Sequence, residues 1–396
     1  MQPLILSAVR TPIGKFLGGL SDIPAPKLGA IAIAEAVKRA GVSASDVEEV
    51  IMGNVLQAGV GQAPARQAAI FAGLPNTIAA FAVNKVCGSG LKAVMLAAQA
   101  IRAGDASIVV AGGMESMSRT PFLLPNVRNG YKYGDQKTVD SLIHDGLWCA
   151  FENWAMGDAA EHIATKCGVN RAEQDRFSAQ SHQRAGDAWK RGDYTAEVVP
   201  VTPQTPPSSG KKATEPIAQD EGIRADTTPE GLAKLRPVFK PDGTVTAGNA
   251  SQLSDGASAL VIASPEAATK LGSKPLARIL AYATSGVDPK DIFIAPVSAV
   301  SMALAKANLS LAQVDLFELN EAFAAQMLAC GKELGLDESR VNVNGGAIAL
   351  GHPIGASGAR VLTTLVHALH RRNLRYGVAS LCLGGGNAVA IVVEKV

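Results

Sequence analysis

The chain contains one local pattern twice. Near residue 89, Ser-Gly opens an apolar helical stretch that leads through a turn to a strand and then to Gly112-Gly113. Near residue 357, Ser-Gly again opens a helical stretch, and a strand over residues 376–383 ends in glycines. Repetition of a helix–strand unit predicts an internal duplication. Two related halves would place the N-termini of the matching helices near one interface.

Short aliphatic runs alternate with longer helical patterns, which indicates an α/β protein. We expect strands over residues 4–9 and 50–55 and a helix over residues 28–40. The stretch 91–101 is apolar on most sides and predicts a helix buried between layers, followed by a strand over 108–111. A chain of 396 residues, 47% of them apolar, exceeds what one hydrophobic core usually serves.

A region of different character separates the two copies of the pattern. Residues 119–246 contain many turn-formers, particularly between 203 and 210, and a polar helix over 171–190 that we expect on the surface. We interpret this region as an inserted loop domain. The predicted organisation is an N-terminal half over residues 1–268, which carries the insertion, and a C-terminal half over residues 269–396.

Charge and cysteine usage exclude several classes of protein. The net charge is only +2 and no basic stripe is apparent, so nucleic acid is not an expected partner. No uninterrupted apolar run reaches about 18 residues, and the N-terminus lacks a signal-peptide pattern, so we expect no membrane association. The five cysteines form no disulfide framework or zinc-site spacing, which favours a reducing, cytoplasmic location and no metal.

Four short segments place a reactive group in a loop or beside glycines. Cys87 precedes Gly-Ser-Gly at the start of the buried helix, where backbone donors and the helix dipole favour a thiolate. His352 lies between Gly351 and a proline that prevents regular structure. Asn320 follows a strand, and Cys382 ends one. Taken together they indicate a thiol nucleophile with a base, oxyanion donors and a second thiol.

Each of these residues also has a structural interpretation. Either cysteine can be a small buried core residue, and His352 can be an exposed loop histidine. Asn320 can serve as the N-cap of the next helix while also contributing to a site. The glycine-rich run over 345–358 resembles a phosphate loop, but it lacks the Lys-Ser/Thr pair and the dinucleotide fingerprint. Nucleotide chemistry is therefore disfavoured.

The order of five motifs carries a family resemblance. Val-Cys-Gly-Ser-Gly, Gly-Gly-Met-Glu-Ser-Met, Asn-Glu-Ala-Phe, Gly-His-Pro and Cys-Leu-Gly-Gly-Gly follow one another from residue 86 to residue 386. With these motifs the sequence resembles the thiolase family along essentially its whole length. The resemblance implies a five-layered αβαβα fold of two related halves with an inserted loop domain.

The resemblance also implies an activity and a set of catalytic roles. The expected reaction is the ping-pong condensation of two acetyl-CoA to acetoacetyl-CoA and CoA, with no cofactor beyond these CoA substrates. Cys87 would carry the acyl group, and His352 would activate it. Asn320 would fix a water near the enolate oxygen, and Cys382 would exchange the α-proton. Backbone N–H groups of Cys87 and Gly384 would stabilise the thioester oxyanion.

Matching positions in the family imply the substrate contacts. The resemblance places Arg224 near the adenosine phosphates and Ser251 near the pantetheine. The expected apolar wall consists of Leu147, Met156, Phe239, Ala247 and Phe323.

The sequence departs from many short-chain thiolases in two places. Ala155 stands where they have histidine, and Asp291-Ile292-Phe293 stands where several have methionine and glycine. These differences leave open a 3-ketoacyl-CoA thiolase of broader, longer or branched chain specificity, as in β-oxidation of fatty acids.

Two other functions are alternatives to a thiolase activity. A decarboxylating ketoacyl synthase would pair its cysteine with two histidines, or a histidine and an asparagine, so Cys382 favours a thiolase. A non-catalytic acyl-CoA-binding relative would usually have lost one reactive group.

Residues 121–145, with Tyr131, Tyr133 and Ile143, resemble the tetramer contact loop of related bacterial enzymes. We therefore expect a homotetramer built as a dimer of dimers.

Overall fold

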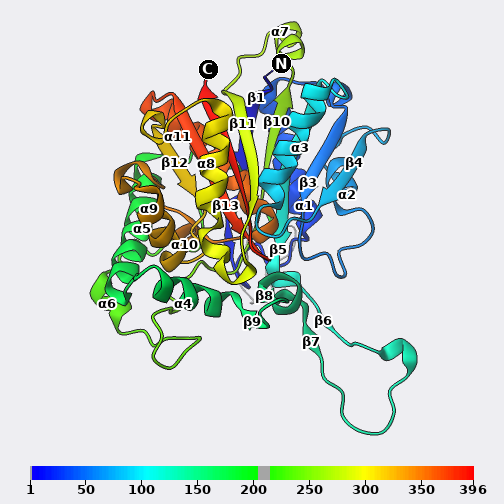
Figure 1. The fold of residues 1–396 in the computed structure, drawn as a ribbon. Coiled ribbons are helices and arrows are strands. Elements are labelled where there is room, and N and C mark those ends of the chain that lie inside the picture. The colour runs from blue at the N-terminus through cyan, green and yellow to red at the C-terminus, as the bar shows by residue number, and fades with distance from the viewer. Residues whose placement is uncertain (1, 204–214) are drawn as a thin grey trace.

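The computed structural model describes residues 2–203 and 215–396 (Figure 1). The turn-formers expected over residues 204–210 lie outside these ranges. No helix within the described residues is long and apolar enough to cross a membrane.

One mixed sheet organises the described residues. Ten strands form it, in the order β12-β13-β14-β11-β1-β10-β5-β3-β4, with β2 paired to β10. Only two residue pairs, Leu4 with Arg278 and Ile5 with Ala277, join β1 to β11 where the halves meet. The strands are β1 (Leu4–Arg10), β2 (Gly14–Lys15), β3 (Glu49–Gly53), β4 (Ala79–Val83), β5 (Ile108–Ser116), β10 (Ser254–Ala263), β11 (Ala277–Gly286), β12 (Leu316–Leu319), β13 (Tyr376–Leu383) and β14 (Asn387–Lys395).

The two halves repeat one topology. The order β1-β10-β5-β3 in the first half matches β11-β14-β13-β12 in the second, with α3 leading into β5 and α11 leading into β13. The helices of these halves are α1 (Ala25–Ala40), α2 (Pro64–Phe71), α3 (Ser89–Ala103), α7 (Pro265–Leu271), α8 (Ala295–Ala307), α9 (Ala324–Leu334), α10 (Ala347–Leu350) and α11 (Ile354–Arg372), with the short helical turns η1 (Ala44–Asp46), η5 (Pro289–Ile294), η6 (Leu311–Gln313) and η7 (Glu338–Arg340). The predicted duplication is confirmed.

Three apolar clusters define the layers. Leu91 of α3 and Leu362 of α11 belong to a cluster that includes strand residues of both halves, such as Leu260 and Leu381. Helices α1 and α2 cover the outer face of the first half, and α8 and α9 cover that of the second. The layers run α, β, α, β, α, with α3 and α11 in the middle. The predicted five-layered fold is confirmed.

Most predicted elements match observed ones, with shifts at their ends. The helix predicted from residue 28 begins at Ala25, because Pro26 is favourable in the first turn. The strand predicted to reach residue 55 ends at Gly53. Residues 376–383 form β13 as predicted.

A long connection between β5 and β10 of the first half carries further helices and short strands. Figure 1 shows its β6–β7 part projecting away from the rest of the molecule. Its elements are η2 (Met117–Arg119), β6 (Phe122–Leu123), η3 (Val127–Asn129), β7 (Val139–Asp140), the π-helical turn η4 (Leu142–Leu147), β8 (Trp148–Cys149), β9 (Trp154–Ala155), α4 (Met156–Lys166), α5 (Arg171–Arg191) and α6 (Pro229–Ala233).

The expectation that the polar helix over 171–190 lies on the surface is wrong in one respect. Helix α5 buries one face, including Gln174, Ser181 and His182. Polar side chains are tolerated there because they find partners: Gln174 donates to Thr244 at 2.9 Å and Ser181 donates to Glu321 at 2.7 Å. Composition alone does not reveal such pairing.

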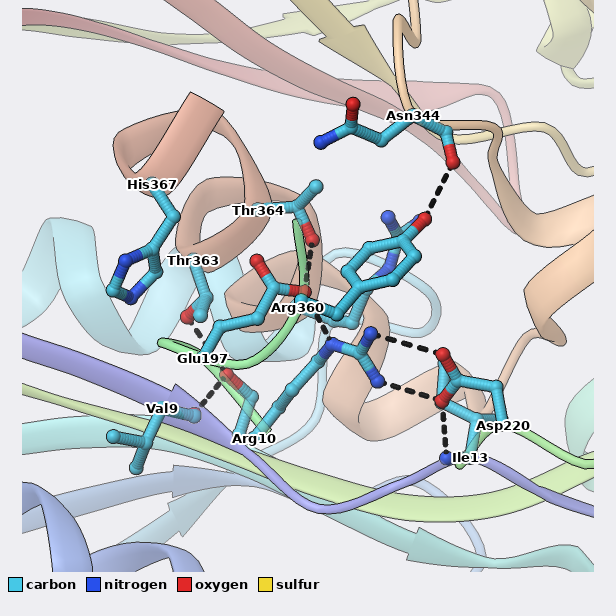
Figure 2. Close-up of polar contacts among 12 residues, drawn as sticks. Val9, Arg10, Ile13, Glu197, Asp220, Asn344, Arg360, Thr363, Thr364 and His367 are labelled. Atoms are coloured by element: carbon cyan, nitrogen blue, oxygen red, sulfur yellow. Dashed lines mark hydrogen bonds and ion pairs between the residues drawn. The ribbon is translucent and has the colours of Figure 1, made fainter. Parts of the chain in front are cut away.

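A buried ionic network fastens this connection to the core (Figure 2). Arg10, at the end of β1, is fully buried. Its guanidinium donates to Glu197 at 2.6 Å and to both carboxylate oxygens of Asp220 at 2.6 and 3.0 Å. Charge-assisted bonds of this kind are the stronger ones. Arg10 of β1 thus binds Glu197 and Asp220, which lie on either side of residues 204–214 in the chain.

Helices α3 and α11 touch through glycines. A Cβ placed at Gly90 would lie 2.8 Å from the backbone nitrogen of Ala359, and one at Gly358 would collide with the backbone of Leu91. Only residues without a side chain allow the two backbones to approach this closely. The contact brings the N-terminal ends of both helices together, as the duplication predicted.

We expect Gly358→Ala to lower the free energy of unfolding by about 1–3 kcal/mol, because the added methyl group overpacks the α3–α11 contact. Denaturant titration followed by circular dichroism measures the change. Gly331→Ala in α9 is the matched control, since a Cβ there meets no atom within 4 Å. Equal stability of the two variants would show that the glycine contact is not required.

Candidate active site

A cavity of ≈ 240 Å³ opens where the two halves meet the long connection. Cys87, His352, Cys382 and Gly384 all line it. The rest of its wall is mainly apolar and comes from both halves and from the connection. Four of the five residues predicted to be catalytic therefore share one cavity, and Asn320 lies behind His352.

Cys87 occupies a tight loop between β4 and α3. Val86 before it has a positive φ of 46°, a conformation that is rare for a β-branched residue. Gly88 after it packs against Leu383, where any side chain would collide. The loop thus holds the thiol immediately before the N-terminus of α3, next to the end of β13.

The surroundings of Cys87 keep its thiol protonated. Burial raises its pKa to about 12, and the negative charge of Glu115 adds to the rise. The backbone N–H groups of Gly384 and of Cys87 itself donate toward the sulfur and lower the pKa in part. Donors placed in this way can also serve the oxygen of a carbonyl under attack by the sulfur.

His352 is held by its backbone and by one ring nitrogen. Its backbone N–H donates to the carbonyl of Gln252 at 3.0 Å, and its ring Nδ1 lies 2.6 Å from Ser357 Oγ. The Ser357 hydroxyl donates to the carbonyl of Pro353 at 2.9 Å, so it accepts the Nδ1 hydrogen. The neutral ring then carries a lone pair on Nε2. Ser357 was not predicted to act on His352.

The imidazole of His352 is neutral at rest. Burial, and secondarily the charge of Arg360, lower its pKa to about 3. Cys87 in the same cavity is also protonated, so the resting state is thiol and imidazole and charge separates only during reaction.

Asn320 continues from β12 and faces the histidine. Its backbone N–H donates to Ser380 at 3.0 Å, which extends the pairing with β13. Its Nδ2 lies 3.4 Å from Nε2 and 3.5 Å from Nδ1 of His352. Its buried Oδ1 finds no partner among the described residues. The amide is therefore positioned to hydrogen-bond a further polar group.

Cys382 lies near the end of β13 and is only 2% exposed. Burial raises its pKa well above the ordinary value, and negative charge on Cys87 raises it further. Two thiols that oppose each other's ionisation favour one thiolate at a time. This property suits two proton transfers in sequence.

Two buried carboxylates support the loops of the site. Glu115 accepts from the backbone of Val55, Leu56 and Gly355 at 2.9–3.2 Å, and burial raises its pKa to about 7. Glu321 similarly joins Ser181 to the segments around residues 342 and 348. Gly355 lies in the first turn of α11, so Glu115 fixes the helix that follows His352.

The residues predicted to bind substrate divide into two groups. Leu147, Met156, Phe239, Ser251 and Phe323 line the cavity. Arg224 and Ala247 are exposed and are not part of its wall. The backbone N–H of Arg224 donates to Nδ1 of His182 at 3.1 Å, which holds the loop rather than the guanidinium.

Ala155, Ile292 and Phe293, where the sequence departs from many relatives, all line the cavity. The rings of Phe293 and Phe323 pack edge to face with centroids 5.3 Å apart. Ile143, predicted only as part of an assembly loop, lines the cavity as well. Its position in η4 gave no local signal of this.

No group of three or more His, Cys, Asp or Glu residues suited to a metal ion occurs in the described ranges.

Family models match both halves of the chain. The thiolase N-terminal domain matches residues 4–266 and the thiolase C-terminal domain matches residues 273–395. The chain belongs to the thiolase family. The predicted family is therefore confirmed.

Curated relatives and a solved structure agree with this membership. The chain is 54% identical over 394 residues to an acetyl-CoA acetyltransferase of Pseudomonas aeruginosa, with 99% of each chain covered. It is 53% identical over 393 residues to one from Escherichia coli, covering 99% of this chain and 98% of the relative. A crystal structure of the Bacillus anthracis acetyl-CoA acetyltransferase superposes with a TM-score of 0.96 at 42% identity, covering 100% and 99% of the two chains.

We expect alkylation of Cys87 in the free thiolase to accelerate with pH up to at least pH 10. The raised pKa of the thiol, near 12, means that thiolate continues to form throughout this range. Iodoacetamide labelling followed by peptide mass spectrometry measures the rate, with buried Cys330 as an internal control. A rate that levels off between pH 6 and 7 would instead reveal a preformed thiolate–imidazolium pair.

Proposed function

We propose that this thiolase is an acetyl-CoA acetyltransferase, which condenses two acetyl-CoA to acetoacetyl-CoA and CoA and also runs the reverse thiolysis. The observation that carries the proposal is one apolar cavity lined by Cys87, His352, Cys382 and Gly384. Family membership and the names of the full-length relatives support the same reaction.

In the first half-reaction Cys87 takes an acetyl group. Nε2 of His352 accepts the thiol proton while the sulfur attacks the thioester carbonyl. The resulting oxyanion is stabilised by the backbone N–H groups of Cys87 and Gly384. As the carbon–sulfur bond to CoA breaks, the CoA thiolate takes a proton from Cys382. The products are acetyl-Cys87, imidazolium, a Cys382 thiolate and free CoA.

In the second half-reaction the Cys382 thiolate removes an α-proton from another acetyl-CoA. The enolate oxygen accepts a hydrogen bond from Nε2–H of His352, with the Asn320 amide holding a water beside it. The enolate carbon attacks the acetyl carbonyl on Cys87, and the sulfur leaves with the imidazolium proton. All groups then return to their resting protonation states. Between the two half-reactions, the negative charge on Cys382 and the positive charge on His352 compensate each other.

The second thiol distinguishes this chemistry from decarboxylating condensation. A ketoacyl synthase generates its carbanion by loss of carbon dioxide and needs no α-proton acceptor at the position of Cys382. A non-catalytic acyl-CoA-binding role would not require the neutral thiol–imidazole pair described above. Both alternatives are therefore less favoured.

We propose that CoA extends from the cavity along the long connection. Ser251 lines the cavity and would face the pantetheine. The exposed Arg224 and Ala247 would contact the part of CoA that lies beyond the cavity wall. No further cofactor is needed for this reaction.

A second candidate is a 3-ketoacyl-CoA thiolase for longer or branched chains. The observation that favours it is the cavity wall at Ala155, Ile292 and Phe293. Alanine leaves space that a histidine would fill and removes a polar contact. An apolar wall suits a hydrocarbon chain, as in fatty acid metabolism.

We propose a homotetramer in which residues 121–145 make contacts between dimers. Phe122 is 66% exposed, Leu124 is 53% exposed and Tyr133 is fully exposed, an unusual concentration of apolar surface.

Residues 1–268 and 269–396 remain the proposed halves. The cytoplasmic location stays a proposal, supported by five cysteines that are all free thiols in the described ranges.

We expect the protein to consume acetoacetyl-CoA in the presence of CoA, measured as loss of enolate absorbance. Cys87→Ala should reduce kcat by at least 10³-fold because no acyl-enzyme forms. Cys382→Ala should also be inactive in thiolysis but should still become acetylated at Cys87. Cys149→Ala, outside the cavity wall, is the control. Absence of wild-type turnover with every 3-oxoacyl-CoA tested would reject the proposed function.

Ala155→His is expected to narrow the chain-length range. The larger side chain should lower kcat/KM for 3-oxohexanoyl-CoA about tenfold, while acetoacetyl-CoA changes less than threefold, since one methylene contributes about 1–3 kcal/mol of discrimination. Steady-state kinetics with both substrates measure this. A parallel fall for both would place Ala155 outside the acyl-binding part of the cavity.

A further inference from the structure

A buried ion pair lies behind the catalytic residues. Nη1 of Arg360 is 3.6 Å from Oε2 of Glu318, and each side chain is only 2% exposed. Neither the three guanidinium nitrogens nor the two carboxylate oxygens hydrogen-bond to another described residue. Burial of two charges with so few hydrogen bonds is costly and contributes little to stability. Fold stability alone therefore does not account for the pair.

The pair and the catalytic contacts share the same two elements. Asn320 directly follows β12 and its backbone N–H continues the pairing with β13, so its side chain points to the same side as that of Glu318, two residues earlier. Ser357 and Arg360 are three apart on α11 and lie on one helix face. Asn320, His352 and Ser357 form one bridge between β12 and α11. Glu318 and Arg360 form a second bridge one step further from the cavity.

Other charged residues near the pair could serve as partners for Glu318 or Arg360. Glu321 and Glu197 lie close enough to act electrostatically on Glu318, as does Arg184 of α5. Glu321 is already satisfied by Ser181, Asn342 and Ile348, and Glu197 by Arg10 and Thr364. Figure 2 shows Arg360 on the same helix as Thr363 and Thr364. Glu318 remains the nearest carboxylate for Arg360.

Burial raises the pKa of Glu318 to about 8, and the charge of Arg360 opposes the rise. A contact of 3.6 Å therefore joins the Arg360 guanidinium to a carboxyl group whose pKa is raised. Such a contact depends on the relative position of β12 and α11.

We propose that Glu318 and Arg360 are positioning residues that set how α11 lies on β12 and thereby hold Asn320 against His352. Loss of either member would let the helix settle differently on the strand. The 3.4 Å approach of Asn320 Nδ2 to His352 Nε2 would then lengthen. The kinetic part of the test rests on the proposed function, whereas the labelling part does not.

A double-mutant cycle tests the proposal. Arg360→Met and Glu318→Leu should each lower kcat for acetoacetyl-CoA thiolysis about tenfold and leave KM within twofold. The double variant should be no slower than either single variant, because the two residues act as one unit. Replacing both buried charges together leaves neither one unpaired, so we expect the double variant to fold and to be informative even if a single variant does not. Arg360→Lys should recover part of the loss by retaining the charge.

Labelling of Cys87 with iodoacetamide at pH 8 gives a readout that needs no substrate. A displaced His352 accepts the thiol proton less well, so labelling should slow about tenfold in the single variants. A purely electrostatic effect of Arg360 would have the opposite sign, because its removal raises the pKa of His352. Thr363→Val, one turn further along α11, is the control for general disturbance of the helix.

Labelling that is unchanged or faster in Arg360→Met would overturn the proposal, as would independent and additive effects on kcat in the cycle. An inactive wild-type enzyme whose variants still show slowed labelling would reject the proposed function and retain the positioning role.

Discussion

The close approach of α3 and α11 is the constraint on which the site depends. Because Gly90 and Gly358 carry no side chain, the two middle-layer helices touch backbone to backbone near their N-terminal ends. The loops before these helices hold Cys87 and His352, which belong to different halves of the chain. Gly113 packs equally closely on the carbonyl of Gly355, next to the carboxylate of Glu115. Backbone proximity, more than direct side-chain contact, therefore aligns the nucleophile with its base.

Around this contact the protein excludes charge from the cavity while concentrating it just behind. The cavity wall is mainly apolar, and burial keeps both thiols and the imidazole neutral at rest. Behind the wall, Glu115, Glu321 and the Glu318–Arg360 pair lie fully within the protein. Glu115 and Glu321 accept hydrogen bonds from the backbone N–H groups of Gly355 and Ile348, so the segments on both sides of His352 are fixed from the rear. Charge then appears in the cavity only when a proton moves.

The sequence predicted the architecture and the reactive groups because both have local signatures. Glycines beside Cys87, His352 and Cys382 mark backbone constraints, and aliphatic periodicity marks buried strands. The role of Ser357 was missed, since it depends on which atom its hydroxyl meets. The buried face of α5 was missed for a similar reason: its polar partners come from residues far away in the chain. Ala247 was carried over by family position as part of the apolar wall, and position in a family does not establish whether a side chain reaches a cavity.

The two halves differ most in the connection that follows the strand after the middle-layer helix. In the first half, residues 117–253 join β5 to β10; in the second, the short turn at 384–386 joins β13 to β14. That turn supplies the Gly384 backbone donor to Cys87, so lengthening the turn would displace the donor. The residues that follow β5 in the first half supply no such donor to Cys87. The two connections are therefore constrained differently: the first can accommodate long segments that line the cavity, whereas the second must keep the backbone N–H of residue 384 directed at Cys87.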